Sequence, residues 1–500
     1  MIAGGGTAGW SSAAALGRHL GPLLDVTLVE SEQIGIIGVG ESTVPTAPGF
    51  HNLLGIDERE FMRENQASFK LAISFENWAR RGDRYIHSFG TVGKGVWLGD
   101  FQHFWLEAVA QGFGGDLGDY CLEFKAAEAH KFFKSKDQPL NFAYHLDAAL
   151  YSRYLRRFAE SHGVKRVEGR IAQVEQDPES GYLRALKLES GERLEGDLFI
   201  DCTGFRALLI GQALGTGFED WLHWLPTNSA LPIQTRAVGP AVPYTRAIAH
   251  EAGWMWKIPL QQRIGCGLVF ASDFMSDDEA HRRMHEQIEG EILIEPPAIR
   301  FRAGRRHHVW EKNCVAIGLA GGFVEPLEST AIHLTQIGIT RFLQTFPFTG
   351  FDDALIRRFN ERSREEIEKV RDFVIMHYHL TERDDTPFWN HVRTMKVPDT
   401  LQQRIELFRE NAQAYQANEE LFRVDSWLQV MIGQRLQPRA YHHLARLTQP
   451  EQLRAALASL RTNIASAVAG MPSHQDFLDS YCPATTEPAN ASAQRSEGGD

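Results

Sequence analysis

Gly4-Gly5-Gly6-Thr7-Ala8-Gly9 matches the glycine pattern GxGxxG, and an alanine- and leucine-rich segment follows it to Leu20. The next segment, Asp25-Val26-Thr27-Leu28-Val29-Glu30, has the composition of a strand and ends in an acid 21 residues after Gly9. In a dinucleotide-binding fold, amides at the start of the first helix hold the pyrophosphate, and an acid after the second strand binds the ribose hydroxyls. The glycine pattern alone is weak, but Glu30 at this spacing favours a dinucleotide site over a chance glycine turn.

The composition limits the classes of protein and partner. Five hundred residues exceed one simple core and predict two or three packed units. A net charge of −12 argues against nucleic acid and against an anionic membrane surface as partners. No apolar run approaches the roughly 20 residues of a membrane-spanning helix, and no signal peptide precedes the first motif. The cysteines are scattered and odd in number, which favours a reduced cytoplasmic protein without a metal site: Cys121, Cys202, Cys266, Cys314 and Cys482.

Other segments predict how the fold continues. Residues 197–204 form an apolar strand with an acid and a glycine at its carboxyl end, where α/β folds bind cofactors. Residues 229–272 alternate like the antiparallel strands of a second sheet. We expect one helix to open at Tyr144 and run to about His162, and another to run from Asp352 to about Tyr378. Only three residues precede Gly4, so either the first strand is clipped or the true start of the protein lies upstream.

We therefore predict an α/β fold of mixed α+β character. A Rossmann-like FAD- or NAD(P)-binding fold is interleaved with a mainly antiparallel substrate-side sheet, and a helical C-terminal portion follows. The cofactor domain is predicted at 1–345, with the antiparallel sheet at about 229–272. Residues 346–475 are predicted to be helical and to complete the substrate site. The polar tail, 483–500, is predicted to be disordered.

The segment Phe69-Lys70-Leu71-Ala72-Ile73-Ser74-Phe75 alternates large apolar residues with other residues, as a strand does. Its four large apolar side chains would point to one face, and Lys70 would point to the other beside Ala72 and Ser74. An amine with small neighbours could meet a small reactive species in a pocket. From this segment alone, however, a solvated lysine on a half-exposed strand is the favoured interpretation.

Two further segments are candidates for cofactor or substrate contacts. The glycine-rich loop Gly38–Thr46 could press its backbone against a planar cofactor, or it could be a structural turn. In Arg84–Gly90, His87 and Phe89 share a face and could stack on an aromatic substrate. Ordinary core packing is the alternative for these two rings.

Later in the chain, Gly253–Pro259 places Trp254 and Trp256 on one face of a strand, as a rigid wall or as core. Residues 319–330 then lead into a helix predicted to begin near Ala331 and end before Pro347. Ser329 and Thr330 stand where N-caps belong, so free amides there can hold a small anion. Glu328 is either a charge that complements the helix dipole, which is favoured in isolation, or a catalytic base.

Together these motifs resemble those of flavin-dependent halogenases of the tryptophan halogenase family, to about residue 445. The resemblance rests on the following stretches: Gly4–Trp10, Gly38–Thr46, Phe69-Lys70, the WxWxIP pattern Trp254–Pro259, and Pro326-Leu327-Glu328-Ser329-Thr330.

The resemblance implies an FAD-dependent enzyme that uses FADH2, O2 and chloride or bromide. A separate NAD(P)H-dependent flavin reductase would supply the FADH2. Hypohalous acid would travel through an internal tunnel to Lys70, which would hold it by hydrogen bonding or as a haloamine for delivery to an electron-rich aromatic carbon. Glu328 would assist the lysine and is a candidate to accept the ring proton.

The resemblance also implies roles for other residues. The implied cofactor-binding residues are Gly4, Gly6, Thr7, Ala8, Gly9, Glu30, Gly38, Val39, Gly40, Glu41, Ser42, Thr43 and Leu319. Thr330 and the amide of Ala331 would hold the halide. The implied substrate contacts are His87, Phe89 and Ser329, and the implied tunnel wall is Trp254, Trp256 and Pro45. The wall would keep the organic substrate away from the flavin and suppress hydroxylation.

Two departures from the family pattern limit these expectations. Ala331 stands where the family commonly has glycine, so a positive φ would be costly there and the halide geometry would be crowded. Residues 426–434 lack the paired tyrosine and the glutamate with which tryptophan-specific members grip the amino acid. Free L-tryptophan is therefore not assigned as the substrate, and a smaller, uncharged arene such as indole, or a larger natural product, fits equally well. A homodimer is a further expectation.

Two alternatives stay open on the sequence. A flavin-dependent aromatic hydroxylase shares the cofactor fold, but it typically has Gly-Asp-Ala where this chain has Gly318-Leu319-Ala320. A catalytically silent flavoprotein is the other alternative, and the presence of both Lys70 and Glu328 disfavours it.

Overall fold

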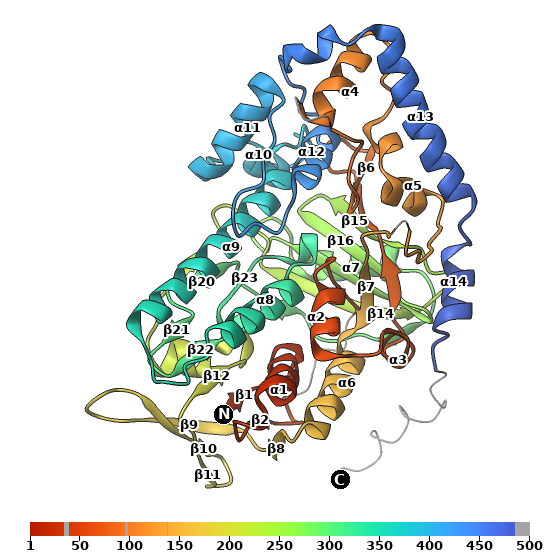
Figure 1. Ribbon diagram of the computed structural model, residues 1–500. Helices are drawn as coiled ribbons and strands as arrows, with labels where there is room; N and C mark the ends of the chain where they lie inside the picture. Colours follow the sequence, from red (N-terminus) through yellow and green to blue (C-terminus); the bar gives the residue numbers. More distant parts are fainter. Residues whose placement is uncertain (35–39, 96–98, 138, 486–500) are drawn as a thin grey trace.

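The computed structural model describes residues 1–34, 40–95, 99–137 and 139–485. Its first layer is a six-stranded sheet that is parallel except for the β21–β22 pair (Figure 1). In order across the sheet, the strands are β21 (Trp310–Glu311), β22 (Cys314–Ala316), β12 (Phe199–Asp201), β1 (Ile2–Ala3), β2 (Thr27–Glu30) and β8 (Lys165–Glu168). The short first strand and the strand at 197–204 are thus neighbours at the centre of this sheet, which confirms the Rossmann-like fold.

The helix that follows the glycine motif packs between two others. Helix α1 (Thr7–Leu20) contacts α6 (Ala148–Ser161) and α8 (Ala331–Gln344). Its buried face is rich in alanine, which lets the neighbouring helices approach closely. Residues of α1 and β1 join those of α6 and α8 in one hydrophobic cluster beside the sheet.

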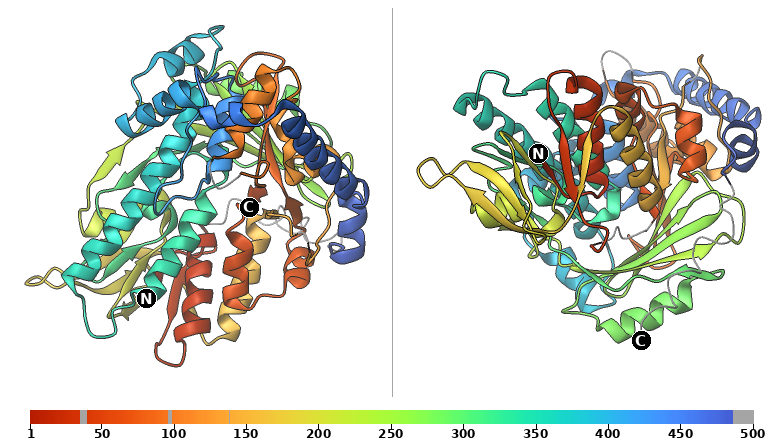
Figure 2. Two further views of the ribbon diagram at one scale, coloured as in Figure 1. Left: turned by 45° about the horizontal axis from the view of Figure 1, so that its top comes forward. Right: turned by 90° about the horizontal axis from the view of Figure 1, so that it is seen from below.

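The second large sheet is mainly antiparallel, as predicted for 229–272, but it recruits strands from the N-terminal third. In order across it lie β18 (Ile292–Ile294), β14 (Ser229–Arg236), β17 (Arg263–Phe270), β16 (Gly253–Pro259), β15 (Tyr244–His250), β5 (Ala72–Glu76) and β6 (Arg84–Ser88), with β19 (Ile299–Arg300) also paired to β14. The β15–β5 pair is parallel, and the other pairs are antiparallel. The sheet is distinct from the nucleotide-type sheet when the molecule is seen from below (Figure 2).

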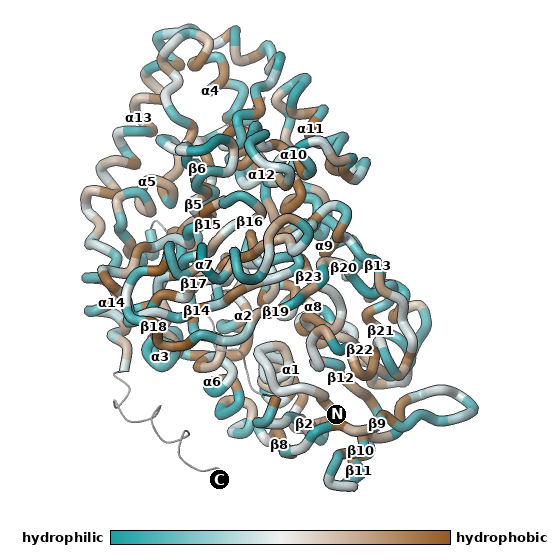
Figure 3. The backbone as a smooth tube through the Cα atoms, turned by 180° about the vertical axis from the view of Figure 1, so that it is seen from behind, coloured by the Kyte–Doolittle hydropathy of each residue, from teal (hydrophilic) through white to brown (hydrophobic). Residues whose placement is uncertain are grey.

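Three small sheets complete the strands. They are β3-β7-β4, with β3 (Gly40–Ser42), β7 (Ala143–Asp147) and β4 (Ser68–Lys70); β11-β10-β9, with β11 (Arg193–Glu195), β10 (Leu183–Leu188) and β9 (Ile171–Gln176); and β13-β20-β23, with β13 (Phe218–Asp220), β20 (Gly304–Arg306) and β23 (Gly322–Phe323). The β9–β11 sheet projects from the body of the molecule (Figures 1 and 3).

Helices cover the end of the molecule opposite β1 and β2 (Figure 1). The long helix α9 (Asp353–His379) begins at the Asp352 cap and agrees with the predicted helix. The remaining helices are α2 (Ala47–Leu54), α3 (Glu58–Glu64), α4 (Phe101–Ala110), α5 (Leu122–Glu128), α7 (Asp277–Gln287), α10 (Pro387–Thr394), α11 (Asp399–Asn411), α12 (Val424–Gly433), α13 (Pro450–Ala469) and α14 (His474–Tyr481). In the described part of the chain, no helix combines the length and apolar character needed to cross a bilayer.

Two sequence predictions of local structure are wrong. Tyr144–Asp147 belongs to β7, and the helix begins after it, because the Asp147 carboxylate accepts the N–H groups of Ala149 and Leu150 as an N-cap. The segment 69–75 is not one strand, since β4 ends at Lys70 and β5 begins at Ala72 in a different sheet. Both parts are buried rather than half-exposed. Of the tail predicted to be disordered, residues 486–500 lie outside the described residues.

Candidate active site

A cavity of about 820 Å³ opens at the carboxyl ends of β1, β2 and β12. Gly4, Gly6 and Glu30 line it. Gly6 is the N-cap residue of α1, and no side chain among the described residues caps this helix start, so its amides are available to a ligand. A Cβ on Gly6 would have no described atom within 4 Å, whereas a Cβ on Gly9 would lie 1.8 Å from the carbonyl oxygen of Gly4. Gly6 therefore leaves room for a ligand, and Gly9 lets the helix approach the strand.

The acid at the end of β2 is fixed in place beside this cavity. Glu30 accepts hydrogen bonds from Trp10 Nε1 at 3.2 Å and from Arg166 Nε at 2.6 Å. A further set of arginines lines the cavity, which sequence reasoning missed: Arg153, Arg156, Arg170 and Arg206. Arg153 and Arg156 are three residues apart on one helix, and that spacing was the available signal. Bare amides, cations and a fixed acid are the groups that a dinucleotide such as FAD requires, so the cavity fits it.

The other residues predicted to bind the cofactor are divided between locations. Thr7, Ala8 and Gly9 form the first turn of α1. The turn that contains Leu319 lies against this helix turn, as shown by the 2.7 Å that would separate a Cβ on the neighbouring Gly318 from Ala8 Cβ. Strand β3, which carries Gly40, Glu41 and Ser42, contacts β16 and β17, and Thr43 follows it. Gly38 and Val39 lie outside the described residues.

Lys70 is completely buried, so its interpretation as a solvated surface cation is wrong. Its Nζ donates hydrogen bonds to the carbonyl oxygen of Thr43 and to Ser329 Oγ, each at 3.1 Å, and lies 5.1 Å from the centre of the Phe89 ring. Burial lowers the pKa of the amine to about 7, although the negative charge of Glu328 opposes this shift. A substantial fraction of Lys70 is therefore neutral and nucleophilic near neutral pH.

Glu328 is also completely buried and lies between two histidines. His87 Nδ1 is 3.0 Å from Oε2, and His377 Nε2 is 2.8 Å from Oε1 but off the line that a hydrogen bond needs. Tyr85 Oη lies 2.8 Å from the other nitrogen of His377. Burial alone would raise the pKa of the Glu328 carboxyl, but the two histidines lower it to about 2. Glu328 is thus a fixed negative charge, and sequence reasoning missed His377 because it comes from the distant helix α9.

Helix α8 begins at Ala331, as predicted, but the side chains at its start differ from the expectation. Thr330 is the N-cap residue, yet its Oγ1 is buried and has no hydrogen-bond partner among the described residues. Ser329 has the left-handed conformation, with φ of 60°, and Ala331 begins the helix without a positive φ. The strain expected at Ala331 is therefore absent. An unpartnered hydroxyl beside a helix start is a group that could contact an anion.

One of the two tryptophans of β16, Trp254, is held by a carboxylate that sequence reasoning missed. Trp254 Nε1 donates to Glu325 Oε1 at 3.2 Å, and Tyr378 Oη donates to the same oxygen at 2.7 Å. Burial raises the pKa of the Glu325 carboxyl to about 7. The ring centres of Trp254 and Trp256 are 6.1 Å apart, and both rings are packed in the core cluster. Pro45 is half-buried, two residues after the carbonyl that Lys70 contacts.

His87 and Phe89 were predicted to stack on an aromatic substrate, but they cannot sandwich one between them in this structure. Their ring planes are 83° apart and their centres are 6.2 Å apart, whereas a sandwich needs nearly parallel rings. His87 is instead directed at Glu328, and Phe89 lies under the amine of Lys70. Helix α12, which contains residues 426–433, is attached to β6 because Gln429 Oε1 accepts hydrogen bonds from the N–H and the Oγ of Ser88 at 3.0 and 2.8 Å.

The comparisons with known proteins agree with this geometry. The tryptophan halogenase family model matches residues 1–450. Tryptophan 7-halogenase RebH of Lentzea aerocolonigenes is 36% identical over 457 residues, which cover 85% of this chain and 86% of RebH.

Two solved structures are also similar over nearly the whole chain. Xcc4156, a flavin-dependent halogenase from Xanthomonas campestris, has a TM-score of 0.96 at 52% identity and covers 97% of this chain and 99% of its own. BrvH, a flavin-dependent halogenase from Brevundimonas sp. BAL3, has a TM-score of 0.92 at 43% identity, and the match covers 96% of this chain and 98% of BrvH. These matches favour a halogenase over a hydroxylase or a silent flavoprotein, and the chain belongs to the tryptophan halogenase family of flavin-dependent enzymes.

Proposed function

We propose that Lys70 is the residue that holds hypohalous acid and delivers its halogen to an electron-rich arene. The single observation that carries this proposal is the complete burial of Lys70, with its amine held between Thr43 and Ser329. Bound reduced FAD supplies, with O2 and halide, the hypohalous acid. Gly4, Gly6, Glu30 and the four arginines of the cavity would hold the cofactor.

The transfer balances as HOX plus ArH giving ArX plus water. The O–X bond breaks with its electron pair on oxygen, the ring carbon supplies the pair of the new C–X bond, and the ring proton and the hydroxide form water. If Lys70 forms a haloamine first, water is released in that step and the amine is regenerated in the second. A neutral amine serves either route, and its lowered pKa makes that form accessible.

In this proposal, Glu328 acts mainly through its charge. Electrophilic attack places positive charge on the ring, and a buried carboxylate stabilises that charge strongly because little water screens it. With a pKa of about 2, Glu328 is a weaker base than Lys70. The amine of Lys70 is therefore the better acceptor for the ring proton, in contrast to the role first suggested for Glu328.

Further elements of the proposal concern the halide, the wall and the partners. Thr330 Oγ1 and the amide of Ala331 contact chloride or bromide, and Trp254, Trp256 and Pro45 separate the cofactor from the arene. The arene is indole-like and lacks the charged groups of free tryptophan. Helix α12 does not offer the paired tyrosine and the glutamate with which tryptophan-specific members grip those groups. A separate NAD(P)H-dependent reductase supplies FADH2, and the enzyme works in the cytoplasm as a homodimer.

The decisive experiment compares Lys70→Ala with wild type, using a generic flavin reductase, bromide or chloride, and a panel containing indole and L-tryptophan. We expect halogenated product to fall to background while flavin oxidation continues. Lys125→Ala is the matched control, because this partly exposed lysine pairs with Asp119 and Glu128 away from the site. Halogenation that persists in Lys70→Ala would refute the assignment, and a hydroxylated product formed without halide would indicate a monooxygenase reaction.

A further inference from the structure

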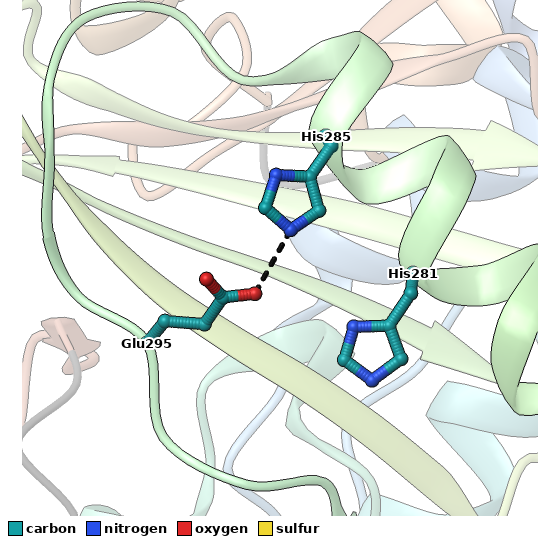
Figure 4. A group of neighbouring side chains, drawn as sticks. All are labelled: His281, His285 and Glu295. Carbon is teal, nitrogen blue, oxygen red and sulfur yellow. Dashed lines mark hydrogen bonds and ion pairs between the residues drawn. The ribbon is translucent and has the colours of Figure 1, made fainter.

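A pair of histidines on helix α7 meets a carboxylate from the segment after β18. His281 and His285 are four residues apart and therefore project from the same side of the helix (Figure 4). Glu295 approaches them from the chain that follows β18, with Oε1 2.9 Å from His285 Nε2. One ligand atom from each residue lies within 4.8 Å of the other two, and all three side chains are exposed.

We propose that His281, His285 and Glu295 bind a divalent transition-metal ion, with Zn²⁺ as the chemically preferred cation. Two imidazole nitrogens and one carboxylate oxygen are a donor set that suits Zn²⁺ and the neighbouring metals Co²⁺, Ni²⁺ and Cu²⁺. Three protein ligands leave at least one position for water. The sequence prediction of no metal site considered cysteine spacing and did not consider this i, i+4 pair.

A bound metal would lie about 2.0–2.2 Å from each ligand, so its ligand atoms lie within about 4.4 Å of one another. Here the three ligand atoms lie within 4.8 Å of one another. The exposed side chains can close this gap by rotation about their own bonds, and Glu295 already contacts His285. The cations beside the site are neutralised, because Arg282 pairs with Glu279 and Glu286. The positive charge of Arg282 is therefore offset, and it repels a metal ion at the cluster less than an unpaired arginine would.

A bound metal would attach α7 to the edge of the antiparallel sheet. Helix α7 lies on the outer face of that sheet and contacts β14 and β17 (Figure 2). Strand β18 pairs with β14 through an irregular register, and Ile292, Leu293 and Ile294 remain partly exposed on it. A cross-link from His281 and His285 to Glu295 would hold this edge strand in place. The site is stabilising and separate from the halogenation chemistry.

The test uses the full-length protein with any affinity tag removed. We expect ZnCl2 to bind with one-to-one stoichiometry by calorimetry and to raise the midpoint of thermal unfolding. His281→Gln and His285→Gln should each remove the saturable binding and the upward shift, and Glu295→Gln should weaken the binding. The double variant H307Q/H308Q is the matched control, because these two histidines are also exposed but lie next to each other outside any helix. It should bind Zn²⁺ as wild type does.

Several outcomes would overturn the proposal. Wild type that shows no saturable Zn²⁺ binding would do so, as would an equal upward shift in the His281→Gln variant. Loss of binding in H307Q/H308Q would place the metal elsewhere. Halogenation should be insensitive to EDTA, and inhibition by EDTA would contradict a purely stabilising site. These measurements do not depend on whether Lys70 is the catalytic residue.

Discussion

His87 Nδ1 lies 3.0 Å from the carboxylate of Glu328, and both side chains are at most 1% exposed. His377 approaches the other carboxylate oxygen from α9, so the negative charge is enclosed between groups from two distant parts of the chain. A buried carboxylate without such partners would tend to take up a proton. The two histidines therefore keep Glu328 ionised beside the loop that carries Ser329.

We predict that Glu328→Gln lowers kcat for halogenation by roughly 10²-fold, because the variant loses a preorganised negative charge. The KM for the arene should change little, and flavin oxidation should continue. Product formation and flavin oxidation are measured together. Glu107→Gln on α4 is the control carboxylate, since it pairs with Gln111 and Tyr441 rather than with the site. Wild-type turnover in Glu328→Gln would remove this residue from the reaction.

We predict that Thr330→Val keeps or raises thermal stability but weakens the binding of halide. The Oγ1 of Thr330 is buried without a partner among the described residues, and such a group costs about 1–3 kcal/mol. Valine has a similar shape without the hydroxyl, so we expect equal or higher thermal stability. The halide concentration for half-maximal rate should rise if the hydroxyl contacts the anion.

Thr335→Val is the control, because its hydroxyl already donates to the carbonyl oxygen of Ala331 at 3.0 Å. That variant should keep the wild-type halide dependence. A Thr330→Val enzyme with unchanged halide dependence would contradict the proposed halide contact.

Much of the fold follows from patterns that are local in sequence. The glycine motif with Glu30 predicts the central strands and α1, and periodicity predicts α9 within a residue or two. Tyr144–Asp147 was misassigned because the same residues both end a strand and cap the next helix. The alternation at 69–75 predicted extended backbone, but the change of sheet at Leu71 depends on Pro243 and Phe89, which bond its N–H and its carbonyl oxygen.

The chemistry of the site was predictable only in part. Lys70, Glu328 and Thr330 stand in recognisable motifs, but their surroundings come from long-range packing. His377 reaches Glu328 across 49 residues of chain, and Glu325 reaches Trp254 across 71. No spacing rule connects such pairs, so neither the fixed charge of Glu328 nor the anchor of the tryptophan wall could be read from the sequence.

Because the amine of Lys70 is buried, we predict that the difference in free energy of unfolding between wild type and Lys70→Met depends on pH. Its pKa is about 7 in the folded protein and 10.5 when unperturbed. Below pH 7 both states are protonated, and the folded protein bears the full cost of a buried charge. Between pH 7 and 10.5 the unfolded chain binds more protons, so the stability of wild type rises relative to the variant.

We therefore expect Lys70→Met to be the more stable protein at pH 6, with the gap closing as pH rises toward 10.5. Unfolding midpoints measured from pH 6 to 10 check this. Lys187→Met, at an exposed lysine of β10, should show a difference from wild type that varies little with pH. A gap for Lys70→Met that stays constant or widens would show that the amine is not held near neutrality.

Gly6→Ala and Gly9→Ala should fail in different ways, because the two glycines face different surroundings. A Cβ on Gly9 would lie 1.8 Å from a backbone oxygen, so Gly9→Ala must displace α1 from β1 and should lower the unfolding midpoint sharply.

Gly6 has φ of −74°, which any residue can adopt, and a Cβ there meets no described atom within 4 Å. Gly6→Ala should therefore keep the wild-type midpoint but bind FAD more weakly, since its methyl group enters the space that the amides leave for pyrophosphate. Equilibrium dialysis of FAD and thermal unfolding, both run on each variant, distinguish the two effects. Unweakened FAD binding in Gly6→Ala would mean that the cofactor is not held at this helix start, and an unchanged midpoint in Gly9→Ala would refute the close contact of helix and strand.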